Sequence, residues 1–185
     1  MSEQKQTGTA GWKKELLEWI KIILTAAAIA LFLNTCIISN SRVPSNSMEN
    51  TIMTKDRILG SRLAYRFGSH PQRGDIVIFK HETGPGRENT RLVKRVIGLP
   101  GETVDIRDNL VYINGSEIPL DEPYLAEPME SADYHFEVPD GCYLMLGDNR
   151  NYSADARKWP DPYVPESAIS AKVLFRYYPG FKRIE

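Results

Sequence analysis

One long apolar segment near the N-terminus limits what this chain can fold into. It runs from Ile22 to Ile38, and nothing comparable occurs after Ser39. Only four of its residues are not strongly apolar: Thr25, Asn34, Thr35 and Cys36. A helix that spans a bilayer needs roughly 17 to 25 apolar residues, so this segment is near the short limit. The sequence therefore predicts either a membrane anchor or a cleavable secretory signal, followed by a more polar domain.

The end of the apolar segment favours an anchor that stays on the protein. Lys13 and Lys14 precede the segment, as basic residues do in a secretory signal. A cleavage site, however, needs small side chains at the downstream end, where this chain has Cys36, Ile37 and Ile38. We therefore expect an uncleaved anchor, with a cleaved signal as the alternative.

The distribution of lysines around this segment predicts its orientation. Lys5, Lys13, Lys14 and Lys21 precede it or stand at its start, and only Arg42 follows closely. By the positive-inside rule, the N-terminus then lies in the cytoplasm. We expect a cytoplasmic tail over residues 1–18, a single transmembrane helix over 19–39 and an extracytoplasmic domain over 40–185.

The remaining residues are typical of a single β-rich domain. A chain of 185 residues has room for one globular domain with a sizeable core. Short runs rich in β-branched and aromatic residues predict strands at Asp75–Phe79, Thr103–Ile106, Leu110–Ile113, Tyr143–Leu146 and Lys172–Tyr178. Most of the prolines lie beyond residue 40, which argues against long helices there. The expected fold class is mainly β, with twisted antiparallel sheets.

Charge and cysteine content exclude some functions. The formal net charge is -1, so the chain has no basic footprint for nucleic acid. Cys36 and Cys142 lie far apart, and we expect no disulfide between them. We interpret Cys142 as a buried, small apolar residue without a catalytic role. The sequence shows no sign of a metal site or an organic cofactor.

A serine close to the membrane is the first candidate for chemistry. The segment Ser41–Ile52 is rich in small polar residues and could be a simple juxtamembrane linker. Ser47, however, lies nine residues beyond Ile38 and so no more than about 30 Å from the membrane surface. A nucleophile at this position would meet only substrates that are held near the bilayer.

A serine nucleophile needs a neighbouring base, and a neutral lysine can serve. In the strand-like segment Arg91–Ile97, a period of two puts Lys94 on the face of Leu92 and Val96, with Arg95 on the other. If the Lys94 face is buried, desolvation would lower the pKa of this lysine towards neutrality. The pattern alone does not choose the buried face, and a surface lysine stays the alternative.

A dense polar loop, Gly147–Trp159, follows the predicted strand that ends at Leu146. Such loops on rigid scaffolds often carry function. Asp155 and Arg157 could form an ion pair, and Ser153 could donate a hydrogen bond to a neighbour. A hydrogen-bonded surface turn is the alternative.

Taken together, the motifs of this chain resemble those of the bacterial type I signal peptidase family. In order they are Pro44–Met48, Asp56–Leu59 with Tyr65–Phe67, Arg73–Val77, Lys94–Gly101 and Gly147–Asp155. The resemblance extends from the anchor to Tyr178, and the short chain is similar to the compact forms typical of Gram-positive bacteria.

The resemblance implies a membrane-bound serine endopeptidase, with no cofactor or metal, whose extracytoplasmic β-rich domain is catalytic. It would remove signal peptides from preproteins that emerge from the export machinery at the lipid bilayer. Ser47 would be the nucleophile and Lys94 the general base of a reaction through an acyl-enzyme. The Ser45 hydroxyl and the Ser47 N–H would bind the oxyanion, Ser153 would orient Lys94, and Asp155 and Arg157 would support the site. Small pockets that select Ala-x-Ala would be lined by Met48, Ile52, Leu92, Val93, Val43 and Ile58.

The chain departs from the usual family pattern at five positions, none of which is a proposed catalytic group. Asn46 stands in place of a glycine, and asparagine is the least costly substitute if this residue needs a positive φ. The other departures are Asn50 for proline, Lys55 for glycine, Ala156 for serine and Pro160 for glycine.

Three other functions stay open on the sequence. The first is a different Ser/Lys protease, of the self-cleaving repressor or conjugation-associated type, although no DNA-binding helical domain accompanies it. The second is a catalytically silent anchored β-module that binds exported proteins. The third is a protease that uses His70, His81 or His135, none of which lies in a motif.

Overall fold

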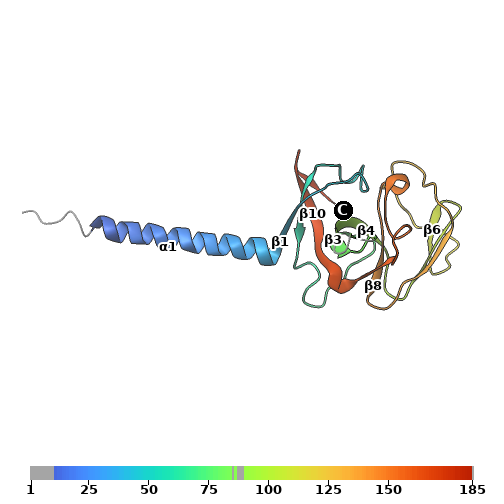
Figure 1. The fold of residues 1–185 in the computed structure, drawn as a ribbon, viewed down its shortest axis with the longest axis horizontal. Coiled ribbons are helices and arrows are strands. Elements are labelled where there is room, and N and C mark those ends of the chain that lie inside the picture. Colours follow the sequence, from blue (N-terminus) through green and yellow to red (C-terminus); the bar gives the residue numbers. More distant parts are fainter. Residues whose placement is uncertain (1–10, 85, 87–89, 185) are drawn as a thin grey trace, which may run out of the picture. The chain divides into compact units, whose positions relative to one another are not determined.

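The structure, a computed structural model, describes residues 11–84, 86 and 90–184, and the chain divides into two compact units after Ile37. The first unit is helical: α1 (Gly11–Phe32) continues into a π-helical turn, η1 (Leu33–Ile37) (Figure 1). Together α1 and η1 form a helical segment of 27 residues with a mean hydropathy of 2.1. At 1.5 Å per residue it measures about 40 Å, and no residue of α1 is buried. Its length and composition suit a membrane anchor.

The helix differs in extent from the predicted anchor. It begins at Gly11 rather than at Trp19, because the intervening lysines, glutamates and leucines are good helix formers. It ends at Ile37, since Ile38 and Ser39 pair with a second strand and so belong to the following unit. Of the predicted cytoplasmic tail, residues 1–10 lie outside the described part of the chain. The assignment of tail, anchor and outer domain stays a prediction.

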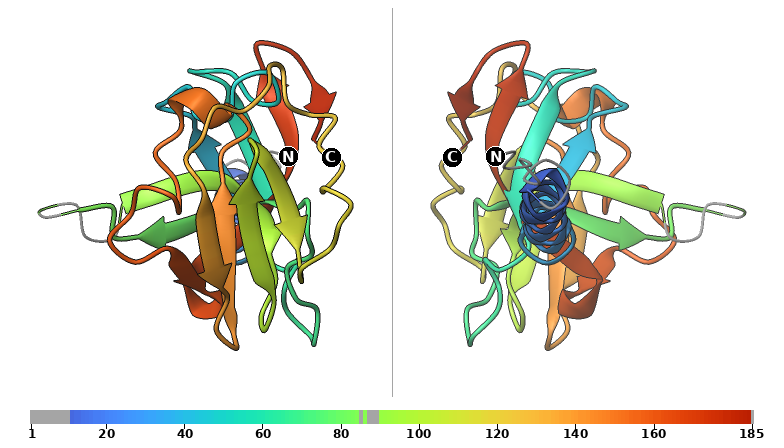
Figure 2. Two further views of the ribbon diagram at one scale, coloured as in Figure 1. Left: turned by 90° about the vertical axis from the view of Figure 1, so that its right-hand side faces the viewer. Right: turned by 90° about the vertical axis from the view of Figure 1, so that its left-hand side faces the viewer.

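The second unit consists of two antiparallel sheets, which confirms the predicted fold class (Figures 1 and 2). The larger sheet has the order β1-β2-β10-β3-β4-β8-β9, with β11 paired to β10. Its strands are β1 (Ile38–Arg42), β2 (Arg57–Ser61), β3 (Ile76–His81), β4 (Thr90–Gly98), β8 (Cys142–Leu146), β9 (Tyr163–Pro165), β10 (Ile169–Tyr178) and β11 (Lys182–Arg183). The smaller sheet has the order β6-β5-β7, from β5 (Thr103–Arg107), β6 (Leu110–Ile113) and β7 (Tyr134–Glu137). Two 3-10 turns, η2 (Arg150–Tyr152) and η3 (Glu166–Ala168), complete the unit.

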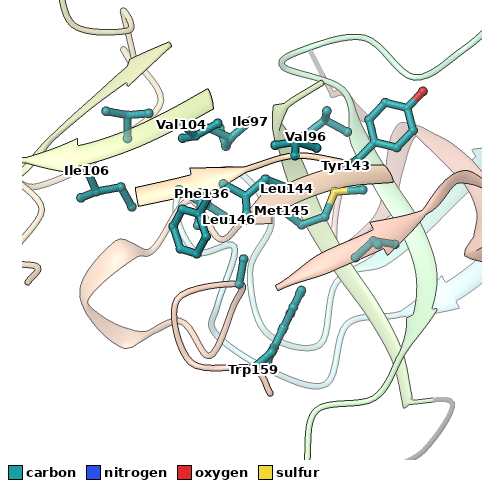
Figure 3. Packing of buried hydrophobic residues seen from close by; sticks show 14 of the residues in the cluster. Val96, Ile97, Val104, Ile106, Phe136, Tyr143, Leu144, Met145, Leu146 and Trp159 are labelled. Carbon is teal, nitrogen blue, oxygen red and sulfur yellow. The ribbon is translucent and has the colours of Figure 1, made fainter. Parts of the chain in front are cut away.

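Two hydrophobic cores lie on opposite faces of β3. Val77 and Phe79 point into the larger core, whereas Ile76 and Ile78 point into the smaller one. Figure 3 shows the larger core, in which Val104, Ile106 and Phe136 of the smaller sheet meet residues of β8 and Trp159. The smaller core contains Ile58 from β2 and Val43, Met48 and Ile52 from the segment between β1 and β2. Polar residues that lie between the two cores, such as Lys94 and Arg95 of β4, are therefore withdrawn from water.

The predicted strands agree closely with β3, β5, β6 and β8, and Lys172–Tyr178 forms the second part of β10. Asp108 and Asn109, with φ of 51° and 62°, make the tight turn between β5 and β6. The prediction that Cys142 is buried is wrong: it lies half-buried at the start of β8, and both cysteines are free.

Candidate active site

Ser47 lies in a turn that two apolar anchors hold against the smaller core. Met48 is 1% exposed and Ile52 is fully buried, and the Ile52 N–H donates to the Met48 carbonyl at 2.8 Å. Upstream, Val43 exchanges backbone hydrogen bonds with Lys55 and Asp56. The turn therefore has a fixed position relative to the sheet. Within it the Ser47 side chain is mostly buried, and its hydroxyl lies 3.3 Å from that of Ser45.

Lys94 lies in the middle of β4 with only 2% of its surface exposed. Burial lowers its pKa from 10.5 to about 8, although the negative charges of Asp155 and Asp148 act in the opposite direction. Its Nζ donates to the Ser153 hydroxyl at 3.1 Å. The structure thus buries the Lys94 face, one of the two faces between which the strand pattern could not decide. Arg95 on the other face is also buried, because it pairs with Asp148 at 2.8 Å.

The loop after β8 holds a buried ion pair behind Lys94. Asp155 is fully buried and accepts hydrogen bonds from Arg157 Nε at 2.8 Å and from its terminal nitrogen at 2.9 Å. Burial alone would raise the pKa of Asp155, but Arg157 and the Gly147 N–H hold it below its ordinary value. Asp155 therefore stays charged, and the fully buried Ser153 is fixed two residues before it.

Gly147 joins the serine turn to this loop. A Cβ at this position would lie 2.2 Å from the Ser153 hydroxyl oxygen and 2.4 Å from the Ser47 carbonyl oxygen. Only glycine allows so close an approach. The Asn149 N–H also donates to the Ser47 carbonyl at 3.1 Å. The backbone of Ser47 and the hydroxyl that binds Lys94 are therefore neighbours across Gly147, although Ser47 and Lys94 form no direct hydrogen bond.

Gly147 and Asn149 had no predicted role of their own. The sequence offers one signal for Gly147. This glycine follows directly after a fully apolar strand, at a position where no turn type requires a glycine. Its close approach to Ser47 depends on the packing of segments that are a hundred residues apart, which spacing cannot reveal.

A cavity of about 210 Å³ opens beside Ser47. Four of the six predicted pocket residues line it: Val43, Met48, Leu92 and Val93. Ser45 lines it as well, together with Ser41, Arg42, Pro44 and Arg91, which sequence reasoning did not select. Ile52 and Ile58 do not line it, and both are fully buried in the smaller core.

Two of the family departures adopt unusual backbone conformations. Asn50 and Lys55 have φ of 72° and 75°, in the left-handed region that glycine favours. Asn46 is not among the described residues with positive φ, so its replacement of glycine causes no strain of this kind. Ala156 is buried against the larger core, and Pro160 is exposed after Trp159.

The three histidines contact other groups. His70 bonds to Glu166 at 2.9 Å, His81 to the Asp161 carbonyl at 2.7 Å, and His135 to Asp105 at 2.5 Å. None of them contacts Ser47. Within the described ranges, no group of three or more His, Cys, Asp or Glu side chains could hold a metal ion.

Known proteins are similar to this chain over most of its length. The family model described as signal peptidase, peptidase S26, matches residues 16–178. A signal peptidase I of Leptolyngbya laminosa is 38% identical, with 89% of this chain and 80% of that protein covered. A signal peptidase I of Bacillus licheniformis is 35% identical over 85% of this chain and 84% of its own length. Signal peptidase IB of Staphylococcus aureus is 34% identical, with 90% of this chain and 92% of that protein covered.

Among solved structures, a signal peptidase I from Enterococcus faecalis V583 is 37% identical. The match covers 55% of this chain and 95% of that one, with a TM-score of 0.47. The family match and the curated relatives together extend over nearly the whole chain. The chain therefore belongs to the S26 family of bacterial type I signal peptidases, which are serine peptidases that process signal peptides.

Proposed function

We propose that this peptidase cuts preproteins after Ala-x-Ala, with Ser47 as the nucleophile and Lys94 as the general base. The observation that carries the proposal is the burial of Lys94, which lowers its pKa to about 8 beside the loop that contacts Ser47. At neutral pH a useful fraction of this lysine is an uncharged amine, and such an amine can accept the proton of a serine hydroxyl.

The reaction would proceed in two steps. The Ser47 oxygen attacks the carbonyl carbon of the scissile bond while Lys94 takes the hydroxyl proton. Lys94 then gives this proton to the leaving amine, which departs and leaves an ester on Ser47. In the second step Lys94 takes a proton from water, whose oxygen attacks the ester carbonyl carbon. The bond from this carbon to the Ser47 oxygen then breaks, Lys94 returns the proton to that oxygen, and the signal peptide is released with a free carboxyl group. Ser153 keeps the Lys94 amine oriented throughout.

Two donors next to the nucleophile suit the oxyanion of each step. The Ser47 N–H has no acceptor among the described residues, and the Ser45 hydroxyl lies next to the Ser47 hydroxyl. Loss of one such donor typically costs about 3 to 4 kcal/mol of transition-state stabilisation.

Two open strand edges support binding of the substrate as an extended chain. β1 is the outer strand of its sheet, and β8 pairs with β4 only from Arg95 onward. Residues Ser41–Val43 and Arg91–Val93, which line the cavity, thus both have an edge without a strand partner in the described part of the sheet. A peptide between them could form main-chain hydrogen bonds. The small apolar cavity favours side chains the size of alanine.

The apolar helix supports a position at the membrane, and the lysines before it favour a cytoplasmic N-terminus. The outer unit would then face the side on which preproteins emerge. Ser47 follows the helix by only ten residues, which keeps it close to membrane-held substrates.

The proposal is tested with the full chain in detergent and a preprotein that carries an Ala-x-Ala site. Mass spectrometry of the products should locate the cut after the second alanine, and Ser47→Ala should abolish it. The control for Lys94→Ala is Lys80→Ala, at an exposed lysine on the adjacent strand β3. The Lys80→Ala variant should keep activity. Cleavage elsewhere would overturn the specificity, and a folded but inactive wild type would favour the binding module.

A further inference from the structure

A second hollow lies on the other side of the Ser47 turn. The residues of this turn line two different cavities. Ser45, Ser47 and Met48 line the first cavity, whereas Asn46 and Glu49 line a hollow of about 340 Å³. Asn149 and Tyr152 from the loop after β8 form part of the opposite wall. The turn that carries Ser47 is thus a partition between two cavities.

The second hollow continues away from Ser47. Ala126 and Glu127 line it and also line a larger hollow of about 610 Å³, which extends to the β5–β6 turn at Asp108. We call these two adjoining hollows the exit groove. For a polypeptide bound with its scissile bond at Ser47 and its preceding residues in the first cavity, the exit groove also borders the Ser47 turn and so offers a path for the residues after the cut.

The exit groove is acidic, in contrast to the first cavity. Among the described residues, no lysine or arginine lines either of its hollows. Glu122 and Asp148 are neutralised by Arg150 and Arg95. Four further carboxylates form no ion pair with any described residue: Glu49, Glu127, Asp108 and Asp121. The first cavity instead has Arg42 and Arg91 at its margin.

We propose that the exit groove binds the first residues of the mature protein after the cut and prefers basic side chains there. The inference rests on the proposed role of Ser47. Glu49 and Glu127 lie nearest to the cut, since both line the hollow that Asn46 borders. Lysine or arginine shortly after the scissile bond would be attracted to them, and glutamate or aspartate would be repelled. The attraction acts through partly exposed charges, so it should weaken with added salt.

Three preproteins that differ only in the third residue after the cut, as Lys, Gln or Glu, test the groove with the full chain in detergent. At low salt we expect kcat/KM to be about fivefold higher for the Lys than for the Glu substrate, as for one or two exposed charge pairs. The ratio should fall below about twofold in the double variant E49Q/E127Q and in 0.5 M NaCl. Glu117→Gln, at an exposed carboxylate that lines neither hollow, should keep the fivefold ratio.

Equal rates for the three substrates in the wild type would overturn the inference, and so would a ratio that E49Q/E127Q leaves unchanged. Ser47→Ala, assayed in parallel, separates this failure from that of the proposed function. If Ser47→Ala still cuts while the charge preference holds, the nucleophile is wrong and the groove stands. If Ser47→Ala is inactive and the preference is absent, only the groove is wrong.

Discussion

Acidification should inactivate this peptidase by protonating Lys94. With the ordinary pKa of 10.5, about one lysine in 3,000 would be neutral at pH 7; with a pKa of about 8, about one in eleven is neutral. Burial therefore increases the amount of available base roughly 300-fold, which corresponds to about 3 kcal/mol. Below pH 8, kcat/KM should fall about tenfold per pH unit, and above it the rate should level off.

The assay is kcat/KM of the full chain in detergent on one preprotein between pH 5.5 and 9.5. Lys80→Ala is the matched control and should give the same profile, because Lys80 is exposed. A rate that does not change between pH 6 and 9 would refute the reasoning. A rate that keeps rising about tenfold per pH unit up to pH 9.5 would also refute it, since Lys94 would then have the pKa of a lysine in water.

Three further variants test other parts of the account by denaturation and kcat/KM. Lys94→Met should be more stable than wild type by about 3 kcal/mol below pH 8, because the folded wild type must hold a buried charge there. As the pH rises from 8 through 10.5, the lysine becomes neutral in the unfolded state as well, so this difference in stability should disappear. A difference that stays constant with pH would contradict the lowered pKa of Lys94. Gly147→Ala should reduce kcat/KM at least tenfold and destabilise the fold by about 1 to 3 kcal/mol, because the added Cβ would overlap the Ser47 carbonyl. The control Gly180→Ala should change neither kcat/KM nor stability, since there is open space around Gly180. Lys55→Gly should be more stable than Lys55→Ala by about 1 kcal/mol, since φ at this position is 75°, and equal stabilities would argue against the left-handed conformation.

The strands that could be predicted from the sequence are those with enough apolar residues to require a place in a hydrophobic core. Tyr143–Leu146 is a continuous apolar run and could only lie in a core, as it does in β8. β1 and β2 were not predicted, because Ile38–Arg42 is mostly polar and has little intrinsic β-preference. It becomes a strand through its register with β2, a long-range pairing that local pattern does not encode.

The candidate site shows the same division. The two-residue period around Lys94 correctly placed it with Leu92 and Val96, but it could not say which face is buried, and the structure covers both. The pocket residues divide for a related reason. Val43, Met48 and Ile58 all belong to the smaller core, but only Val43 and Met48 border the cavity, and a motif match cannot distinguish the two cases.

The most direct test of the central claim, that Ser47 and Lys94 act as one unit, is a double-mutant comparison. Cleavage rates of one preprotein are measured for Ser47→Ala, Lys94→Ala and the double variant, each confirmed as folded. Groups that share a single step are strongly non-additive, so all three variants should fall to the same residual rate. A Lys94→Ala variant that retains most activity, or a double variant slowed by the product of the two single effects, would contradict the dyad.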